Sequence, residues 1–290
     1  MKVCGFTIVR NAVKYDYPVV ESITSILPLC DEFIILAGNS DDSTLDLLRH
    51  IDSEKIRIIP SIWDDTLKEG GKVLAAETNK ALDLIPEKYD WVFYLQADEV
   101  VHEKYHDAIY SSMKHFLDDK KVEGLLFNYT HFYGTYNYVA DSRKWYRNEI
   151  RVIRNDKSIR SYRDAQGFRK NGKKLKVKKV DAFIYHYGYV KNPKTMQIKA
   201  LDFHRLWHDE ELIRNNFKPG ELFDYSEIYS IKLFDSNHPE VMSERIKSTN
   251  WNIKLDISNR KFNLKEKFFY LFEKITGHRL FEYKNYSIIK

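Results

Sequence analysis

The sequence predicts an α/β protein whose mixed, mainly parallel sheet is flanked by helices. Three observations support this fold class. Short apolar runs alternate with segments of helical periodicity over the first 60 residues, as in parallel strands joined by crossover helices. Polar residues directly follow the apolar runs, so hydrophilic side chains gather where strands end. The 290-residue chain is 43% hydrophobic and 31% charged, which is typical of a globular protein with a sizeable core.

Five elements are expected in the first 60 residues. Continuous apolar runs predict buried strands, and apolar residues spaced by three or four positions predict helices. Pro18 is suited to a helix start, and Pro28 ends that helix. In chain order, strand alternates with helix over residues 3–9, 18–28, 32–37, 45–51 and 55–60.

The same patterns continue after an irregular polar segment at 61–70. Apolar periodicity predicts a helix over 72–84 that leads into a strand over 91–96. Gly70, Gly71 and Lys72 begin this helix, and they indicate either a phosphate site at its N-terminus or a flexible loop. The further helices are expected over 103–117 and 194–214, and the further strands over 124–129, 149–154 and 180–189.

Charge is unevenly spread along the chain. The formal net charge is +5, yet residues 143–179 hold 15 Lys and Arg against 3 Asp and Glu, a local surplus of 12. Such a surplus favours an anionic partner: a diphosphate, a nucleic acid or an acidic membrane surface. Two cysteines, Cys4 and Cys30, form no disulfide framework and no metal-binding spacing, which favours a reducing compartment.

No stretch of about 18 apolar residues occurs, and the N-terminal apolar stretch is short. We therefore expect a cytoplasmic protein that is neither secreted by a signal peptide nor membrane-spanning. Peripheral contact with the inner face of the membrane is compatible with its basic region.

Two adjacent carboxylates, Asp98 and Glu99, follow the apolar strand 91–96. The carboxyl ends of strands form the ligand crevice of an open α/β sheet, so these acids are placed to meet a cation or a polar substrate. Carboxylates suit Mg²⁺ or Mn²⁺, and two of them leave the ion free to bind phosphate oxygens. His186 ends another apolar run and would favour Mn²⁺ if the two strands are neighbours. The alternatives are an ordinary acidic turn and a hydrogen-bonded core histidine.

Several motifs together resemble family 2 glycosyltransferases of the GT-A fold. Their order and spacing match over residues 2–190, about two thirds of the chain. The motifs are CGFTIVRN at 4–11, NSDDST at 39–44, TNKA at 78–81, LQADE at 95–99 and HYGY at 186–189.

The resemblance implies transfer of a sugar from a nucleotide-diphosphate donor to a glycan or lipid-linked acceptor, usually with inversion. It implies Mn²⁺ or Mg²⁺ between the donor phosphates, held by Asp98 and Glu99 with His186 in support. We expect a nucleotide-sugar-binding and catalytic domain over 1–190, and a helical C-terminal extension over 191–290 that packs on it. The candidate donor-binding residues are Thr7, Val9, Arg10, Asn11, Gly38, Asn39, Asp42, Lys72, Asn79, Gln96 and Ala97.

Two positions depart from the family pattern. Gly38 stands where the family's loop usually begins with an aspartate, which removes the usual contact to a uracil ring. Gln96 replaces the first acid of the Asp-x-Asp motif, which leaves Asp98 as the main metal residue, and Gln96 is expected to hydrogen-bond the ribose or the sugar. These departures also allow a second hypothesis, a non-catalytic protein of this fold that binds a glycan or a nucleotide.

An inverting transfer needs a base for the acceptor hydroxyl and cationic groups for the departing diphosphate. Asp164 is the first candidate base and Glu149 the second, although Asp164 is equally suited to pair with a neighbouring arginine. The arginines of residues 143–163 are candidates for stabilising the leaving group. Nucleic-acid binding is a further, less favoured alternative, because no recognised motif accompanies the basic surplus. His204 and His208 have helical zinc-ligand spacing but lack the other residues of such a motif.

Overall fold

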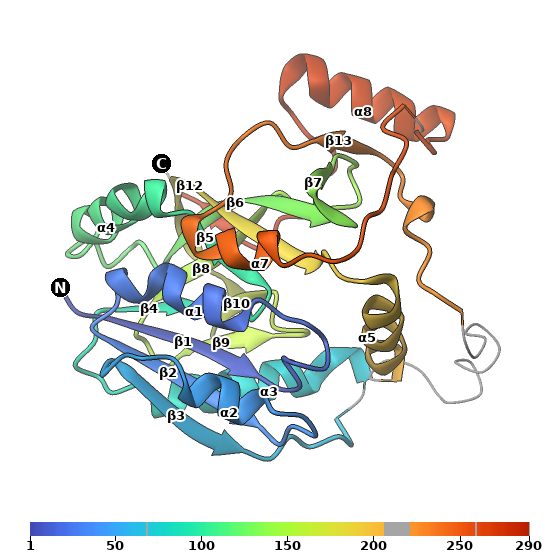
Figure 1. Cartoon of the computed structure of the whole chain (residues 1–290). Coiled ribbons are helices and arrows are strands. Elements are labelled where there is room, and N and C mark those ends of the chain that lie inside the picture. The colour runs from blue at the N-terminus through green and yellow to red at the C-terminus, as the bar shows by residue number, and fades with distance from the viewer. Residues whose placement is uncertain (68, 206–220, 259, 290) are drawn as a thin grey trace.

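The computed structural model describes residues 1–67, 69–205, 221–258 and 260–289 of the chain (Figure 1). The strands of its main sheet are β1 (Val3–Val9), β2 (Glu32–Gly38), β3 (Ile56–Ser61), β4 (Trp91–Tyr94), β5 (Glu99–Val101), β6 (Gly124–Tyr133), β7 (Thr135–Ala140), β8 (Asn148–Arg154), β12 (Lys176–Tyr189), β13 (Ile231–Leu233) and β14 (Ser287–Ile288). A second, three-stranded sheet holds β9 (Ile159–Tyr162), β10 (Gly167–Lys170) and β11 (Lys173–Lys174).

The helices are α1 (Val19–Ile26), α2 (Thr44–Arg49), α3 (Lys72–Leu84), α4 (His106–His115), α5 (Pro193–Arg205), α7 (Ser243–Lys247) and α8 (Leu264–Thr276). Short 3-10 turns precede or follow several of them, at Leu27–Leu29, Glu69–Gly71, Glu103–Tyr105, Tyr225–Glu227 and Glu240–Met242. None of the helices within the described ranges is both long and apolar enough to cross a membrane.

The first half of the main sheet is parallel. β1 pairs in parallel with β2 and β4, and β3 pairs in parallel with β2, which gives the order β3-β2-β1-β4. The strand order changes direction at β1, so the carboxyl ends of β1 and β4 border a crevice. These are the strands expected at 3–9, 32–37, 55–60 and 91–96.

The second half of the sheet is mixed. β8 lies antiparallel between β4 and β6, while β12 runs parallel to β6 and antiparallel to β5. The mixed, helix-flanked sheet expected from the sequence is confirmed, and it is parallel chiefly in its N-terminal half. β5 has three residues, and the hairpin strands β9 to β11 are rich in lysine and arginine, so apolar patterning did not predict them.

Two hydrophobic cores form on opposite faces of the sheet because successive strand residues point to opposite faces. In β1, Val3 and Val9 pack in the core that α1 and α4 cover. Cys4 and Phe6 pack in the other core, beneath α3 and the small sheet. β1 is buried along its whole length, so both of its faces are apolar.

The chain beyond residue 190 combines helices with long connections. The helix expected at 194–214 is described as α5 over Pro193–Arg205, and its remainder, with His208, lies outside the described residues. α8 lies at the top of Figure 1, beyond β7 and β13. The division of the chain at residue 190 stays a proposal.

Arg154 joins β8 to the end of α4. Its guanidinium donates to the carbonyl oxygens of Val122 (3.0 Å) and Leu117 (2.8 Å), and it lies 3.9 Å from the centre of the Trp91 ring. The last carbonyls of a helix have no partner within the helix, and a cation near them is favourable. Arg154 also donates to Phe116, the residue that caps α4.

We predict that Arg154→Leu lowers the free energy of unfolding by about 2–4 kcal/mol, because several carbonyls lose a charged donor together. Urea denaturation measures this change. The control is Arg160→Leu, whose exposed pair with Asp83 is expected to contribute less than about 1 kcal/mol. Equal effects of the two substitutions would contradict the role given to Arg154.

Candidate functional site

Asp98 lies just beyond β4, at the carboxyl end of the parallel strands. Its backbone carbonyl accepts a hydrogen bond from the Tyr187 N–H at 2.8 Å, and His186 on β12 stands opposite Glu99 on β5. As a result, Asp98 Oδ2 lies 3.7 Å from His186 Nε2 and 3.3 Å from Lys199 Nζ on α5. The strands that carry Asp98 and His186 are therefore brought together, as a shared site requires.

Hydrogen bonds fix the tautomer of His186. His131 Nε2 lies 2.8 Å from the carbonyl oxygen of Tyr146, which only accepts, so this nitrogen carries the proton of a neutral His131. His131 Nδ1 then accepts from His186 Nδ1, 3.1 Å away. His186 Nε2 is left with its lone pair, and it faces the Asp98 carboxylate. A histidine held in this way by a second histidine is arranged as a metal ligand.

Burial keeps both imidazoles neutral. It lowers the pKa of His186 despite the neighbouring Asp98 and Glu99, and burial and the nearby His186 lower the pKa of His131 well below its ordinary value. Burial alone raises the pKa of Asp98, but the nearby Lys199 ammonium is the largest opposing influence, and the pKa is lowered to about 2. Asp98 is therefore a carboxylate at neutral pH.

Gly188 allows the close approach of these groups. A Cβ atom at this position would lie 2.7 Å from both Asp98 Oδ2 and His186 Nε2, which is shorter than any ordinary contact. The glycine of the HYGY motif is therefore required because a side chain at this position would clash with Asp98 and His186.

Two buried lysines surround Asp98. Lys199 Nζ also donates to the Gly188 carbonyl at 3.0 Å, and Lys191 Nζ donates to the Asp16 carbonyl at 2.8 Å. The Nζ atoms of both lysines lie 4.7 Å from the centre of the Tyr17 ring, and burial lowers the pKa of Lys191 well below its ordinary value. No sequence motif marks these lysines, and both belong to the chain beyond residue 190, outside the span of the glycosyltransferase-like motifs.

The geometry at Asp98 and His186 fits a divalent cation. An anionic oxygen and a neutral imidazole nitrogen face each other 3.7 Å apart, a span that two ligands of one ion can have. Among the residues that the structure describes, no group of three or more His, Cys, Asp and Glu is arranged to hold a metal. An ion here would therefore take its other ligands from substrate phosphates and water, as Mg²⁺ usually does.

Glu99, which the sequence suggested as a metal ligand, has other partners. Its side chain is fully buried, and its two oxygens each lie 2.7 Å from an Arg151 nitrogen. Tyr129 donates to Oε1 at 2.7 Å, and the Gln96 N–H donates to Oε2 at 3.1 Å. With these four hydrogen bonds made, Glu99 acts in our assignment as a positioning residue for the β4–β5 turn.

The loops after β1 and β2 are tied to each other. Asn11 has a left-handed φ of 56°, its N–H donates to Ser40 Oγ at 2.9 Å, and its Oδ1 accepts from the Asp41 N–H at 3.0 Å. Asp42 Oδ2 accepts from the Lys14 N–H at 2.6 Å. Asn11 and Asp42, expected as donor-binding residues, thus shape the two loops.

The remaining expected donor-binding residues differ in burial. Thr7 and Val9 are buried in β1, and Gln96 and Ala97 are half-buried beside Asp98. Asn79 Oδ1 accepts from the Ser161 N–H at 2.8 Å, which joins α3 to β9. Lys72 is exposed and begins α3, after Gly70 and Gly71 with left-handed φ values of 64° and 69°.

Trp63 occupies the space beside Gly38. A Cβ atom at Gly38 would lie 2.4 Å from Trp63 Nε1, so the missing aspartate of the family motif is explained by a tryptophan that packs in its place. Arg10 lies over the Trp63 ring at 5.6 Å and pairs with Asp65 at 2.5 Å, and its Nε donates to the Asn39 carbonyl at 3.2 Å. Gly38 marked the departure from the family motif in the sequence, but nothing in the sequence identified Trp63 as the residue that packs beside it.

Asp164 and Glu149, the candidate bases, line one cavity of about 290 Å³. Glu149 is buried, and its Oε2 has no hydrogen-bond partner among the described residues. Burial raises the pKa of Glu149 to about 8, and Glu99 and Asp164 add to this effect against Arg151. Burial also raises the pKa of Asp164, which lies in a tight turn. Tyr146 connects this cavity to the site, since it lines the cavity and accepts from His131.

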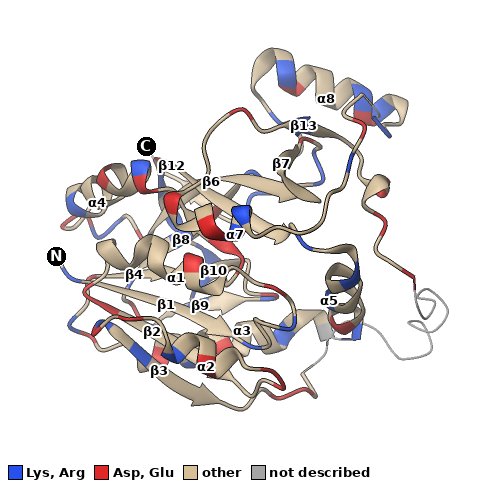
Figure 2. Ribbon diagram, viewed as in Figure 1, with Lys and Arg blue, Asp and Glu red and all other residues tan. Residues whose placement is uncertain are grey.

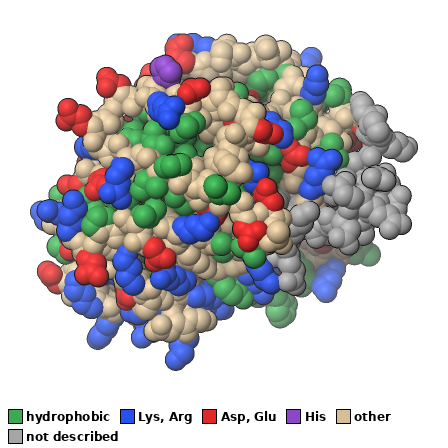
Figure 3. Space-filling model, turned by 90° about the horizontal axis from the view of Figure 1, so that it is seen from below, with side chains coloured by type: hydrophobic (Ala, Val, Ile, Leu, Met, Phe, Trp, Pro, Cys, Tyr) green, Lys and Arg blue, Asp and Glu red, His purple; other side chains and the backbone are tan. Residues whose placement is uncertain are grey.

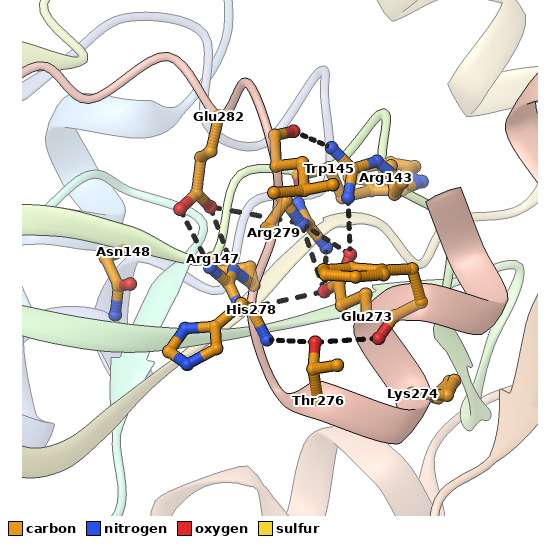
Figure 4. Close-up of polar contacts among 12 residues, drawn as sticks. Arg143, Trp145, Arg147, Asn148, Glu273, Lys274, Thr276, His278, Arg279 and Glu282 are labelled. Atoms are coloured by element: carbon orange, nitrogen blue, oxygen red, sulfur yellow. Dashed lines mark hydrogen bonds and ion pairs between the residues drawn. The ribbon is translucent and has the colours of Figure 1, made fainter. Parts of the chain in front are cut away.

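The C-terminal segment closes the other side of this cavity. Arg143 Nη1 pairs with Glu273 at 3.1 Å, and Arg147 Nη2 pairs with Glu282 at 2.7 Å (Figure 4). Arg279 pairs with Glu273 at 2.9 Å (Figure 4). Acids from the end of the chain thus neutralise arginines of the 143–179 stretch, although more than 100 residues separate Arg143 from Glu273.

Much of the basic surplus in residues 143–179 is engaged within the chain. Basic and acidic positions both occur over the whole ribbon (Figure 2). Ion pairs or hydrogen bonds involve Arg143, Arg147, Arg151, Arg154, Arg160, Arg169 and Lys170. The surplus is therefore weaker evidence for an external anionic partner than the sequence alone suggested.

No family model matches the chain, and no curated protein matches it. Among solved structures, S. aureus TarS is similar at 16% identity and a TM-score of 0.39, over 70% of this chain and 39% of that chain. TarS 1-349 in complex with UDP gives 16% identity and a TM-score of 0.39, over 70% of this chain and 64% of that one.

Glucosyl-3-phosphoglycerate synthase from Mycobacterium tuberculosis, in complex with Mn²⁺, UDP and phosphoglyceric acid, is 15% identical with a TM-score of 0.31. The match covers 45% of this chain and 43% of that chain. This chain thus spans less than two thirds of the length of these proteins.

We predict that Arg151→Met lowers the free energy of unfolding by about 3–5 kcal/mol, because it leaves Glu99 as an unpaired buried charge. Denaturant unfolding followed by fluorescence measures it. Arg147→Met is the matched control, since its pair with Glu282 is partly exposed and should contribute about 1 kcal/mol or less. A loss below 1 kcal/mol for Arg151→Met would refute the role of the buried pair.

We predict a pH-dependent stability from Glu149. Its folded pKa of about 8 lies above its ordinary value of 4.5, so the folded state binds the proton more tightly. The contribution to stability is complete below about pH 4.5 and is lost as the pH rises through about 8, by about 3–5 kcal/mol. The difference in unfolding free energy between wild type and Glu149→Gln, measured from pH 5 to 8, reports it. A difference that stays constant over this range would contradict the assignment.

Proposed function

We propose that this chain is a glycosyltransferase that moves a sugar from a nucleotide-diphosphate donor to a glycan or lipid-linked acceptor, with inversion. The observation that carries the proposal is the pairing of Asp98 Oδ2 with the lone pair of His186 Nε2 at the carboxyl ends of the parallel strands. In open α/β sheets this edge is where ligands bind. The motifs shared with family 2 glycosyltransferases lead to the same reaction class.

In this proposal the donor diphosphate lies next to Asp98. A divalent cation, Mn²⁺ or Mg²⁺, held by Asp98 and His186 would supply positive charge to the phosphates when bound. The Lys199 ammonium, 3.3 Å from Asp98, adds a donor for the same region and offsets charge that grows on the departing diphosphate. The nucleoside is expected along the loops that follow β1 and β2, where Trp63 and Arg10 offer a ring face and a cation.

The acceptor is expected in the cavity that Glu149 and Asp164 line. Either carboxylate is a candidate to take the proton from the acceptor hydroxyl. Glu149 is favoured because its Oε2 is buried without a partner among the described residues. Its pKa of about 8 lies close enough to neutral pH that its carboxylate form is populated and is a stronger base than an ordinary glutamate. Arg151 links this cavity to the donor side, since it bonds Glu99 and lies two residues along β8 from Glu149.

We predict that the chain binds nucleoside diphosphates in a metal-dependent manner and releases them from nucleotide sugars. Asp98→Asn and His186→Ala should each weaken metal-dependent binding by about 10- to 100-fold, since each removes one of the two protein ligands. Calorimetric titration of UDP, GDP, CDP and ADP, with Mn²⁺ and with a chelator, measures this.

Asp83→Asn is the matched control, because its carboxylate lies in an exposed surface pair with Arg160, so binding should be unchanged. No binding of any of these nucleotides would overturn the proposal. Binding without sugar release over a broad acceptor screen would favour a non-catalytic binding protein of the same fold.

A further inference from the structure

The helix α8 presents apolar side chains to solvent along one side. Leu264, Phe268, Leu271 and Ile275 are 89%, 60%, 46% and 83% exposed. Their spacing of four, three and four residues places them in one stripe along the helix. Phe281, which is 90% exposed, follows α8 and contacts Phe269. We call these five exposed residues, Leu264, Phe268, Leu271, Ile275 and Phe281, the outer face.

The opposite side of α8 is anchored to the protein. Tyr270 is buried and donates to Asp141 at 2.6 Å, and Lys274 pairs with Asp141 at 2.9 Å. Glu273 pairs with Arg143 and Arg279 (Figure 4). These contacts anchor the inner side of α8 through residues that lie outside the stripe.

Both ends of α8 are also capped. Asn263 and Glu266 form a reciprocal capping box, and Gly277 ends the helix with a left-handed φ of 70°. A helix with two satisfied ends and an anchored inner side keeps its shape without a partner. The outer face is therefore a preformed surface.

The charge around the outer face is positive. Residues 260–284 contain seven Lys and Arg against three Glu. All three acids have partners within the chain: Glu266 in the capping box, Glu273 with Arg143 and Glu282 with Arg147. Lys265 and Lys267 are exposed beside the apolar stripe, and α8 carries both basic and acidic positions along its ribbon (Figure 2). The accessible charge next to the stripe is therefore chiefly that of lysine.

The face seen from below, away from α8, has a different charge pattern. Acidic and basic side chains are interspersed over it (Figure 3). Single exposed apolar residues elsewhere, such as Ile62 and Tyr110, are ordinary features of a protein surface. A contiguous apolar stripe bordered by lysine is characteristic of helices that lie in the interface of a membrane.

We propose that the outer face of α8, with Lys265 and Lys267, docks on an anionic lipid surface. The apolar stripe enters the boundary between headgroups and acyl chains, and the lysines contact the anionic headgroups. A second copy of the chain fits this face less well, because the lysines of the two copies would repel each other across the contact. The docking does not rest on the proposed function.

One consequence of the docking does rest on the proposed function. Phe281 lines the cavity that holds Glu149 and Asp164, and Tyr270, Glu273 and Lys274 line a neighbouring cavity of about 530 Å³. A lipid-linked acceptor would thus reach the cavities from the membrane on which α8 lies. This narrows the acceptor class of the proposed reaction to lipid-linked molecules.

We test the docking by flotation of the full chain with vesicles of phosphatidylcholine alone, and with vesicles that also contain phosphatidylglycerol. Wild type should float with the anionic vesicles and stay behind with the neutral ones. The double variant Phe268→Ser/Ile275→Ser should bind about tenfold or more weakly, because it removes two exposed apolar anchors. Lys265→Gln/Lys267→Gln should lose about fivefold for each charge removed.

Tyr110→Ser, which removes a 47% exposed ring from α4, is the matched control and should bind as wild type does. Equal binding of wild type and Phe268→Ser/Ile275→Ser would overturn the proposal, as would absence of flotation with anionic vesicles. Sedimentation velocity completes the test: a dimer that Phe268→Ser/Ile275→Ser abolishes, without vesicle binding, would identify a second copy as the occupant instead.

Circular dichroism and thermal unfolding are expected to be unchanged in all three variants, since the substituted side chains are exposed. Nucleotide binding in solution is measured on the same samples. Loss of vesicle binding with retained nucleotide binding separates a failure of the docking from a failure of the proposed glycosyl transfer.

Discussion

The buried ion pair between Glu99 and Arg151 is the interaction on which the site depends. It joins the turn after β4 to β8. Tyr129 on β6 donates to the same carboxylate and so connects a third strand to it. Taking both charges out of water is costly, so such a pair is favourable only when its remaining hydrogen-bonding groups are satisfied. Here both Glu99 oxygens are bonded to Arg151 and to one further donor each. These hydrogen bonds hold the turn that carries Asp98 in place.

A second set of contacts fixes the other half of the site. His131 on β6 and His186 on β12 lie in register on parallel neighbouring strands, so one imidazole sets the tautomer of the other. The Tyr146 carbonyl provides the acceptor that begins this chain of hydrogen bonds. Asp98 and His186 are thus positioned by two hydrogen-bond networks, one charged and one neutral, and Tyr129 joins them because it bonds Glu99 and stacks on His131.

Sequence patterns predicted the features that depend on local chemistry. The apolar runs predicted β1, β2, β3, β4, β6, β8 and β12, because strands with a buried face need continuous or alternating apolar residues. Asp98 and His186 were predicted because polar residues after an apolar run lie at a strand end. The roles of Glu99 and Asn79 were not predictable, because each is decided by a partner far away in sequence, Arg151 and Ser161.

Lys199 and Trp63 were not predictable for the same reason. Lys199 contacts Asp98, and Trp63 packs beside Gly38, although each lies far in sequence from the residue that a motif had marked.

The most direct test of the central claim is electron spin-echo spectroscopy of Mn²⁺ bound to the chain with a nucleoside diphosphate. We expect nitrogen coupling from an imidazole in wild type and its loss in His186→Ala. Absence of nitrogen coupling in wild type, or its persistence in His186→Ala, would contradict the claim that Asp98 and His186 together form the cation site.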